Sequence, residues 1–301
     1  EGALYHELDK DPDDTVPSAD YKPVKRLIEH IRTIYYRNDL SGPLPLHELQ
    51  SLALTYENYQ LAYTPGLITY IYGTKVNDAL LLEGKFTHSE NDTNWWVRSG
   101  RALFIEGTET TSDAKPRFYL PVAYTDPYGA TTKVAYGNYY LFIRETADAL
   151  SNSTAVTKFN FRTLSPAQLK DINDNLSEAI TDELGMVKAI AVMGKDFNND
   201  GAGDEADNLA GLEEITVNEQ NDIQSFFQIA NATGICQSGD LRTKANLLLK
   251  NASSRFIYDL NSYKDYGKPV VVASINREEH FINNPQSPVQ LAFEYSNGLG
   301  K

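Results

Sequence analysis

The stretch Y-T-D-P-Y-G-A-T-T-K-V-A-Y at residues 124–136 decides the fold that the sequence predicts. It contains two β-prone runs, with Asp126-Pro127-Tyr128-Gly129 between them. Proline at the second position of a β-turn presets φ, and glycine is favoured at the fourth position. The pattern is therefore typical of a type I or type II turn, and it predicts two antiparallel strands joined by that turn.

The same signal returns at a nearly fixed distance along the chain. Asp148 and Asp171 begin similar turn-like segments, 22 and 23 residues after the preceding aspartate. Tyr136 and Phe159 also lie 23 residues apart, and one further step reaches residues 181–185. A lone hairpin is marginally stable in water, so such repeats must stack in one sheet. We therefore predict a mainly β fold, an extended curved antiparallel sheet of YD-type strand-turn-strand repeats with a few short helices.

One segment allows two interpretations. Residues 165–180 have helical propensity, because Ser165 suits a helix N-cap and Pro166 suits the first helical position. The repeat register instead places a hairpin here. We predict the hairpin, because pairing with neighbouring strands often overrides a weak helix propensity.

The rest of the sequence suggests four parts. They are a β-rich N-terminal part (1–117), the YD-like repeats (118–195), an acidic inserted loop with short helices (196–250) and strands that continue toward further repeats (251–301). Alternating aromatic and polar residues predict strands at 53–64 and 67–76, and β-branched content favours a strand over a helix at 24–36. We predict an irregular lead-in at 1–23, a turn followed by one helical turn at 41–52, and a loop that carries Trp95 and Trp96. Helices are predicted at 216–230 and 241–252. Strands are predicted at 253–263, 268–281 and 289–301.

The composition excludes several classes of function. The 301 residues carry a formal net charge of −14, and the only basic cluster is Lys22, Lys25 and Arg26, which argues against nucleic-acid binding. No apolar run approaches the roughly 20 residues that span a bilayer. Cys236 is the only cysteine, so the sequence contains neither an internal disulfide nor a Cys-pair zinc motif. The first residue is Glu1, as expected for a piece excised from a longer protein.

Six long stretches carry a resemblance to a known family: 29–67, 78–101, 118–142, 180–195, 247–263 and 293–301. They include F-Y-L-P-V-A-Y-T-D-P-Y-G-A-T-T-K-V-A-Y-G-N-Y-Y-L-F and the terminal F-E-Y-S-N-G-L-G-K. The chain resembles the Tc-toxin B component and its Salmonella-virulence-B and Rhs (YD-repeat) relatives. Two departures are D-I-N-D-N at 171–175, where the family usually has Asp-Pro-Asn-Gly, and the acidic segment at 196–208.

The resemblance implies a role as well as a fold. It implies a secreted, non-catalytic wall segment of a hollow shell that encloses a toxic C-terminal cargo, placed between the propeller and the main repeats. The implied partners are the remainder of the same shell, the C component with its cargo and, indirectly, the pore-forming A component. No position here matches the autoproteolytic aspartates of the family. A shell segment of this kind is also expected to have an exposed sheet edge.

The acidic segment carries the strongest chemical signal. Residues 196–201 fit the start of a calcium loop, D-x-N-x-D-G, in which oxygen ligands at alternate positions wrap a hard cation. The candidate ligands are Asp196, Asn198, Asp200, the Ala202 carbonyl, Asp204 and, at the twelfth position, Asp207. Aspartate is shorter than the usual glutamate there, which predicts weak binding. A solvated acidic loop is the alternative.

Two other functions compete with the shell. One is a calcium-binding extracellular adhesion or carbohydrate-binding β-module that uses Trp95 and Trp96. The other is a hydrolase with an unrecognised carboxylate site, for which His280 with Glu278 and Glu279 is one candidate acid–base group. The remaining histidines are scattered without a metal-ligand spacing.

Overall fold

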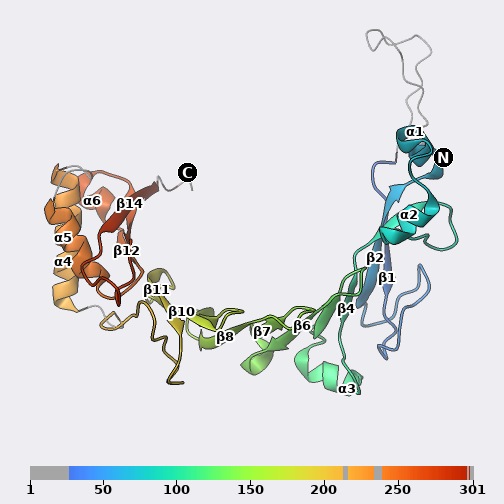
Figure 1. The fold of residues 1–301 in the computed structure, drawn as a ribbon, viewed down its shortest axis with the longest axis horizontal. Helices are drawn as coiled ribbons and strands as arrows, with labels where there is room; N and C mark the ends of the chain where they lie inside the picture. The colour runs from blue at the N-terminus through green and yellow to red at the C-terminus, as the bar shows by residue number, and fades with distance from the viewer. Residues whose placement is uncertain (1–26, 213–215, 234–238, 297, 299–301) are drawn as a thin grey trace, which may run out of the picture. The chain divides into compact units, whose positions relative to one another are not determined.

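The computed structural model describes residues 27–212, 216–233, 239–296 and 298 (Figure 1). The chain divides into two compact units. Unit 1 comprises Glu1–Phe142 and Thr146–Ser151, and unit 2 comprises Ile143–Glu145 and Asn152–Lys301. The predicted lead-in at 1–23 and Cys236 lie outside the described residues.

Unit 1 begins with a three-stranded antiparallel sheet of order β1-β2-β3. Its strands are β1 (Ile31–Tyr35), β2 (Thr55–Tyr63) and β3 (Trp95–Arg98). The strand predictions at 24–36 and 53–64 are confirmed for the described residues. The loop predicted to carry both tryptophans is wrong, because Trp95 and Trp96 pair with β2.

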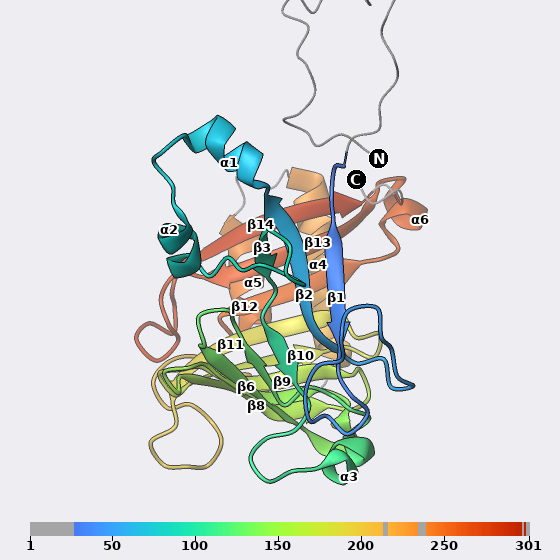
Figure 2. The same ribbon diagram turned by 90° about the vertical axis from the view of Figure 1, so that its right-hand side faces the viewer.

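A strand was also predicted at 67–76, and that prediction is wrong. These residues contribute to helix α1 (Pro65–Tyr72), which precedes α2 (Asp78–Glu83) (Figure 2). The cause is the N-terminal cap: Thr64 accepts a hydrogen bond from Leu67 N at 3.2 Å, and Pro65 occupies the first turn. The cap therefore determines the structure of these residues, although their alternating aromatic and polar side chains are typical of a strand.

The helical turn predicted at 41–52 is also absent. Pro45 O instead accepts a hydrogen bond from Glu48 N in a simple turn.

The rest of unit 1 consists of short elements. They are β4 (Arg101–Leu103), α3 (Thr111–Ala114), η2 (Lys115–Arg117), β5 (Ala123–Thr125), β6 (Thr131–Tyr136) and η3 (Asn138–Tyr140). Strands β4, β5 and β6 pair antiparallel in chain order. The buried residues Tyr36, Leu40, Phe104 and Ala114 form one core cluster, and Ile68, Leu81 and Trp95 form another.

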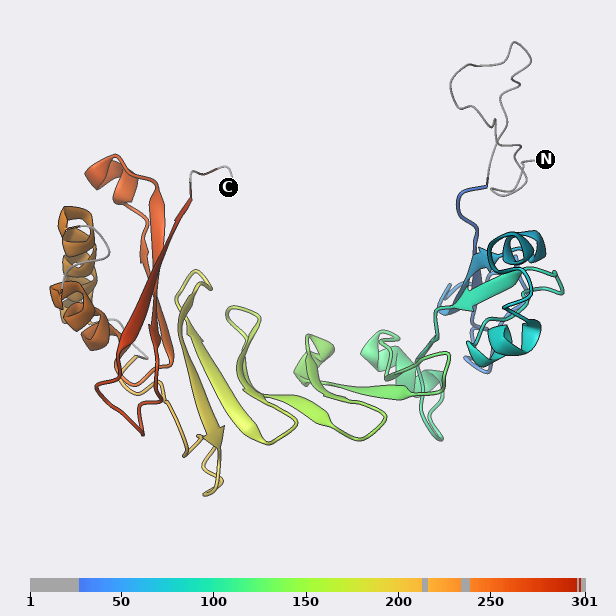
Figure 3. The same cartoon turned by 45° about the horizontal axis from the view of Figure 1, so that its top comes forward.

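The predicted repeat is a series of hairpins. Its turns at Asp126, Asp148, Asp171 and Asp182 begin at an aspartate, whereas the turn at residues 160–164 begins at Asn160. The next strands are β7 (Ile143–Ala147), β8 (Ser153–Asn160), β9 (Ser165–Lys170), β10 (Asn175–Thr181) and β11 (Val187–Lys195) (Figure 3). In the turns of Asp126, Asp171 and Asp182, the carboxylate Oδ1 accepts from the backbone N–H groups two and four residues later, at 2.8–2.9 Å. Each of these turns closes with its own side chain, which explains the recurring aspartate.

The hairpin predicted at 165–180 is confirmed. Residues 165–170 and 175–181 form β9 and β10, which pair antiparallel, so the helical alternative for this segment is wrong. The fourth position of each turn has positive φ: +91° at Gly129, +84° at Gly185 and +65° at Asp174. Aspartate tolerates this left-handed conformation better than most side chains, so the turn survives without its glycine.

Replacing Asp174 with glycine is expected to raise the free energy of unfolding by about 0.5–1 kcal/mol, because glycine has no Cβ strain at positive φ. The Asp174–Lys170 ion pair that is lost is exposed and contributes little. Urea unfolding of the variant would measure the gain. Gly185→Ala at the corresponding position is the matched control and should cost about 1 kcal/mol. A destabilised Asp174→Gly variant would contradict the assignment of strain to this position.

Helices cover one face of the last part of unit 2. Strands β8 to β14 are antiparallel neighbours in chain order, and α4 and α5 pack on β12–β14 (Figures 1 and 3). The elements after β11 are α4 (Val217–Thr233), α5 (Gly239–Leu249), β12 (Ser254–Asp259), α6 (Ser262–Tyr266), β13 (Val270–Arg277) and β14 (Val289–Ser296). Alternate residues Val271, Ala273 and Ile275 of β13 are buried in the main core with Phe226 and Leu248 from the helices.

These elements confirm the fold class as mainly β and antiparallel, with strand-turn-strand repeats and a few short helices. The helices predicted at 216–230 and 241–252 form α4 and α5, and the strands predicted at 253–263, 268–281 and 289–301 form β12, β13 and β14 within the described residues.

Candidate functional site

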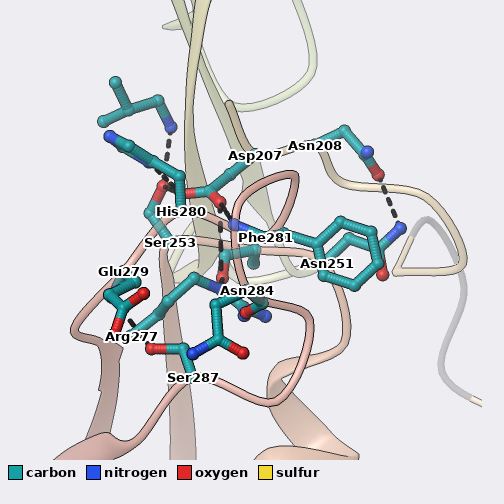
Figure 4. Close-up of polar contacts among 12 residues, drawn as sticks. Asp207, Asn208, Asn251, Ser253, Arg277, Glu279, His280, Phe281, Asn284 and Ser287 are labelled. Carbon is teal, nitrogen blue, oxygen red and sulfur yellow. Dashed lines mark hydrogen bonds and ion pairs between the residues drawn. The ribbon is translucent and has the colours of Figure 1, made fainter. Parts of the chain in front are cut away.

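A buried polar network in unit 2 is built around the carboxylate of Asp207 (Figure 4). Asp207 is only 2% exposed. Its Oδ1 accepts from Phe281 N at 2.5 Å, and its Oδ2 accepts from the Ser253 hydroxyl at 2.5 Å. The Nδ1 atom of His280 lies 3.0 Å from the same Oδ2. One carboxylate thereby joins the end of the acidic segment, the start of β12 and the loop between β13 and β14.

A buried cation accompanies this carboxylate. The Nε atom of Arg277 lies 3.8 Å from Asp207 Oδ1, and the two side chains are 3% and 1% exposed. Arg277 also donates to the carbonyl oxygens of Ala252, at 3.0 Å, and Lys250, at 2.5 Å. Burial lowers the pKa of Arg277 from its ordinary value, and the nearby Asp207 charge opposes that change. The guanidinium therefore ties the end of β13 to the segment after α5.

The residue types match those of a serine hydrolase, but the connections differ. In a catalytic triad the histidine contacts the serine hydroxyl, and the carboxylate orients the histidine. Here the Ser253 hydroxyl donates to Asp207 and accepts from Val192 N at 2.8 Å, so the carboxylate is the central group. The arrangement suits a structural junction that fixes the β13–β14 loop. The proposed pairing of His280 with Glu278 and Glu279 is replaced by its contact with Asp207.

The acidic segment folds against the sheet. Asp204 N donates to Lys195 O at 2.9 Å, which extends the hydrogen bonding of β11. Gln168, which is 2% exposed, donates from Nε2 to Gly201 O at 2.9 Å. A Cβ atom at Gly203 would lie 2.3 Å from Met193 O, so glycine is required for this close approach. The insertion is therefore an ordered part of unit 2.

The structure separates the candidate calcium ligands into two groups. The Asp196 carboxylate accepts from Asp200 N and Gly201 N, Asn198 Oδ1 also accepts from Asp200 N, and Asp204 accepts from Phe197 N. The Asp200 carboxylate accepts from Ala202 N. Asp207, expected at the twelfth position, uses both oxygens in its own buried network. The described residues hold no group of three or more His, Cys, Asp and Glu side chains placed to bind a metal ion.

Calcium binding by this segment stays a prediction. Titration calorimetry with calcium is expected to show binding with a dissociation constant of about 10⁻⁴–10⁻³ M, the range of extracellular modules. Asp200→Ala should abolish the heat, because it removes a central candidate ligand. The exposed Asp174→Gly variant is a carboxylate control outside the segment and should bind normally. The absence of heat at millimolar calcium would contradict the prediction.

The side chains of Trp95 and Trp96 are too buried to contact a carbohydrate. Trp95 is 3% exposed and Trp96 is 0% exposed. Trp96 donates from Nε1 to Asp92 Oδ1 at 3.0 Å, and the Arg32 guanidinium lies 4.0 Å from the centre of its ring. The idea that these two rings stack on a carbohydrate is therefore wrong.

A second buried carboxylate stabilises unit 1. Glu57 on β2 is 1% exposed and receives two hydrogen bonds from Arg98 on β3, at 2.8 and 3.0 Å. The Tyr59 hydroxyl donates to it at 2.7 Å. Burial, together with this bond to Glu57, raises the pKa of Tyr59, and the hydrogen bond to Glu57 raises the pKa of Arg98. Because Tyr59 and Arg98 are register partners, this group fixes the pairing of β2 with β3.

Every helix in the described ranges is too short or too polar to cross a lipid bilayer.

Comparison with known proteins finds a likeness in fold. No protein-family model matches the chain, and neither does any curated protein. Solved structures of Tc toxin components do match. The crystal structure of TcdB2-TccC3 matches with a TM-score of 0.63 and 18% identity, over 94% of this chain and 12% of that chain. A Photorhabdus luminescens Tc holotoxin pore structure matches with a TM-score of 0.59 and 14% identity, over 94% of this chain and 14% of that one.

A TcdB2-TccC3-Cdc42 structure also matches, with a TM-score of 0.55 and 18% identity, over 94% of this chain and 15% of that chain. At these identities the likeness lies in the fold. The chain spans only a small share of the length of each of these structures.

Proposed function

We propose that this chain is a non-catalytic wall segment of a secreted toxin-complex shell that encloses a toxic cargo. The observation that carries this proposal is the likeness to TcdB2-TccC3 over 94% of the chain. The series of antiparallel hairpins supports it, because each hairpin pairs with its neighbours in the chain and so extends one sheet, as a wall requires. The chemistry of Asp207, Ser253 and His280 also fits a structural junction better than an active site.

The proposed partners follow from the same likeness. They are the remainder of the same shell, a C component with its enclosed cargo and, indirectly, a pore-forming A component. The matching structures are themselves complexes of TcdB2 with TccC3 and a holotoxin pore. The proposal also places this chain between the propeller and the main repeats of the shell protein. This placement rests on the sequence resemblance.

Protease protection tests the enclosure. The full-length polypeptide that contains this chain would be purified with its cargo-bearing partner and treated with a nonspecific protease. The cargo is expected to survive when it was co-assembled, and to be digested when the same cargo is only mixed with the finished shell. Cryo-electron microscopy of the protected complex should show this chain in the wall of a hollow particle. Equal digestion of the two cargo samples, or a compact particle without a lumen, would overturn the proposal.

A further inference from the structure

Strand β1 lies at the edge of the three-stranded sheet of unit 1 (Figure 2). Among the described strands it pairs with β2 alone. Leu61 N donates to His30 O at 2.9 Å, and in an antiparallel pair such contacts recur at every second residue. Residues 30, 32 and 34 therefore point their backbone groups toward β2. The N–H and C=O groups of Ile31 and Thr33 point the other way, along the outer edge of the sheet.

The chain covers one end of this outer edge and then turns away from it. Leu44 N donates to Tyr35 O at 2.7 Å, so the last residue of β1 has a neighbour on its outer side. The next residues, 45–48, form a turn, and His47 within it has a φ of +69°. The chain thereby leaves the edge before it reaches the first part of β1.

A groove with a volume of about 360 Å³ lies beside the first part of β1. It is lined by residues of β1 and by residues 46–49. Two of the lining side chains are apolar and exposed, Ile31 at 54% and Leu49 at 62%. Native proteins often protect an open sheet edge with lysine, with proline or with a covering segment, and β1 contains neither lysine nor proline. We therefore expect a covering segment in the complete protein.

We propose that an extended segment from elsewhere in the same full-length polypeptide pairs with the outer edge of β1 and occupies this groove. Ile31 and Thr33 each offer one N–H and one C=O group to it, which is how a sheet edge recognises an added strand. Side chains of an extended segment alternate between its two faces, so apolar residues are expected at every second position, where they meet the apolar lining of the groove.

The length of the related structures argues for a segment of the same polypeptide. This chain covers 12% of the TcdB2-TccC3 chain that it matches, so most of a related full-length polypeptide lies outside it. A segment on the same polypeptide also has a high effective concentration at the groove, whereas a strand from a separate component does not. This choice of source rests on the proposed shell role, while the open edge and the groove do not depend on it.

Hydrogen exchange of single backbone amides tests the pairing without any substitution. The isolated chain and the full-length polypeptide that contains it would be compared by mass spectrometry at residue resolution. The amides of Ile31 and Thr33 are expected to exchange about tenfold or more slowly in the full-length polypeptide. Arg32 and Ile34 are the internal controls, because their N–H groups point to β2 and should be protected in both samples. Equal exchange of Ile31 and Thr33 in the two samples would overturn the proposal.

Thr33→Pro removes the outward N–H group that the added segment needs. An edge strand tolerates proline where the N–H lies outside the ladder, so Arg32 and Ile34 should stay protected. In the full-length polypeptide, Ile31 should then exchange as fast as it does in the isolated chain. Thr33→Val is the matched control, since it keeps the N–H and should leave Ile31 protected. The pairing is wrong if Ile31 stays protected in Thr33→Pro, and the outward direction of Thr33 N–H is wrong if Arg32 loses its protection.

Two comparisons separate the source of the segment from the shell role. Protection of Ile31 and Thr33 in the full-length polypeptide alone supports a segment of that polypeptide. Protection that appears only after the cargo-bearing partner is added would assign the strand to the partner and overturn the proposed source. Cryo-electron microscopy distinguishes the two proposals: a hollow particle with no strand beside β1 contradicts only the pairing, and a paired β1 in a particle without a lumen contradicts only the shell.

Discussion

Replacing Asp207 with alanine is expected to lower the free energy of unfolding of unit 2 by about 3–5 kcal/mol. The substitution leaves the Arg277 guanidinium, 3% exposed, without its buried counter-charge. It also removes the acceptor of the Ser253 hydroxyl and of Phe281 N. Buried donors that lose their partner bear the full cost of desolvation.

Hydrogen exchange measured by mass spectrometry, together with urea unfolding, checks this expectation. Protection should be lost first in the β13–β14 loop and at the start of β12, the two segments that the carboxylate holds. Asp204→Ala is the control, because Asp204 is an exposed aspartate three residues earlier whose carboxylate bonds only within the acidic segment. It should cost no more than about 1 kcal/mol. An Asp207→Ala variant as stable as this control would show that the network contributes little.

Trp96→Ala is expected to destabilise unit 1 by about 3–5 kcal/mol, the usual cost of removing a large aromatic side chain from a core. Trp96 is 0% exposed, and its ring lies under the Arg32 guanidinium and 4.9 Å from the His30 ring. The substitution also leaves the Asp92 carboxylate without its indole donor. The loss therefore combines a cavity with a broken polar contact.

Thermal unfolding followed by circular dichroism would measure this loss. Val97→Ala is the control, because Val97 is the next residue of the same strand and is 44% exposed. That variant should change the free energy of unfolding by less than about 1 kcal/mol. Trp96→Phe should fall between the two, since it keeps an aromatic ring but lacks the N–H donor. If Trp96→Ala were no worse than Val97→Ala, the burial of the tryptophan would not matter for stability.

The repeat could be predicted from sequence because its cause is local. The turns at Asp126, Asp171 and Asp182 are each closed by the carboxylate of their first residue, so an aspartate recurs in the sequence at these hairpins. Strand pairing also decided residues 165–181 against their own helical propensity. Helix α1 was missed although its signal was present: the Thr64-Pro65 cap is readable in the sequence, but the alternation of aromatic residues suggested a strand instead.

The Asp207 site could not be predicted, because its parts are far apart in the chain. Asp207 and His280 are 73 residues apart and meet only after β12, β13 and their connecting loop have formed. The local spacing of Asp207 fits a calcium loop equally well, and only tertiary structure shows which contacts its oxygens make. The burial of Trp95 and Trp96 has the same origin, since it depends on pairing with β2 and on helices that precede them.

The acidic segment and its helices also affect the order in which the chain acquires its structure. The hairpins from β8 to β11 join strands that are adjacent in sequence, so their ends meet quickly and at small entropic cost. Pairing of β11 with β12 matches Ala189 with Arg255 and must close a much longer loop. The hairpins can therefore form as the polypeptide emerges from the ribosome. The helix-covered end of unit 2 has to wait until α4, α5 and β12 are complete.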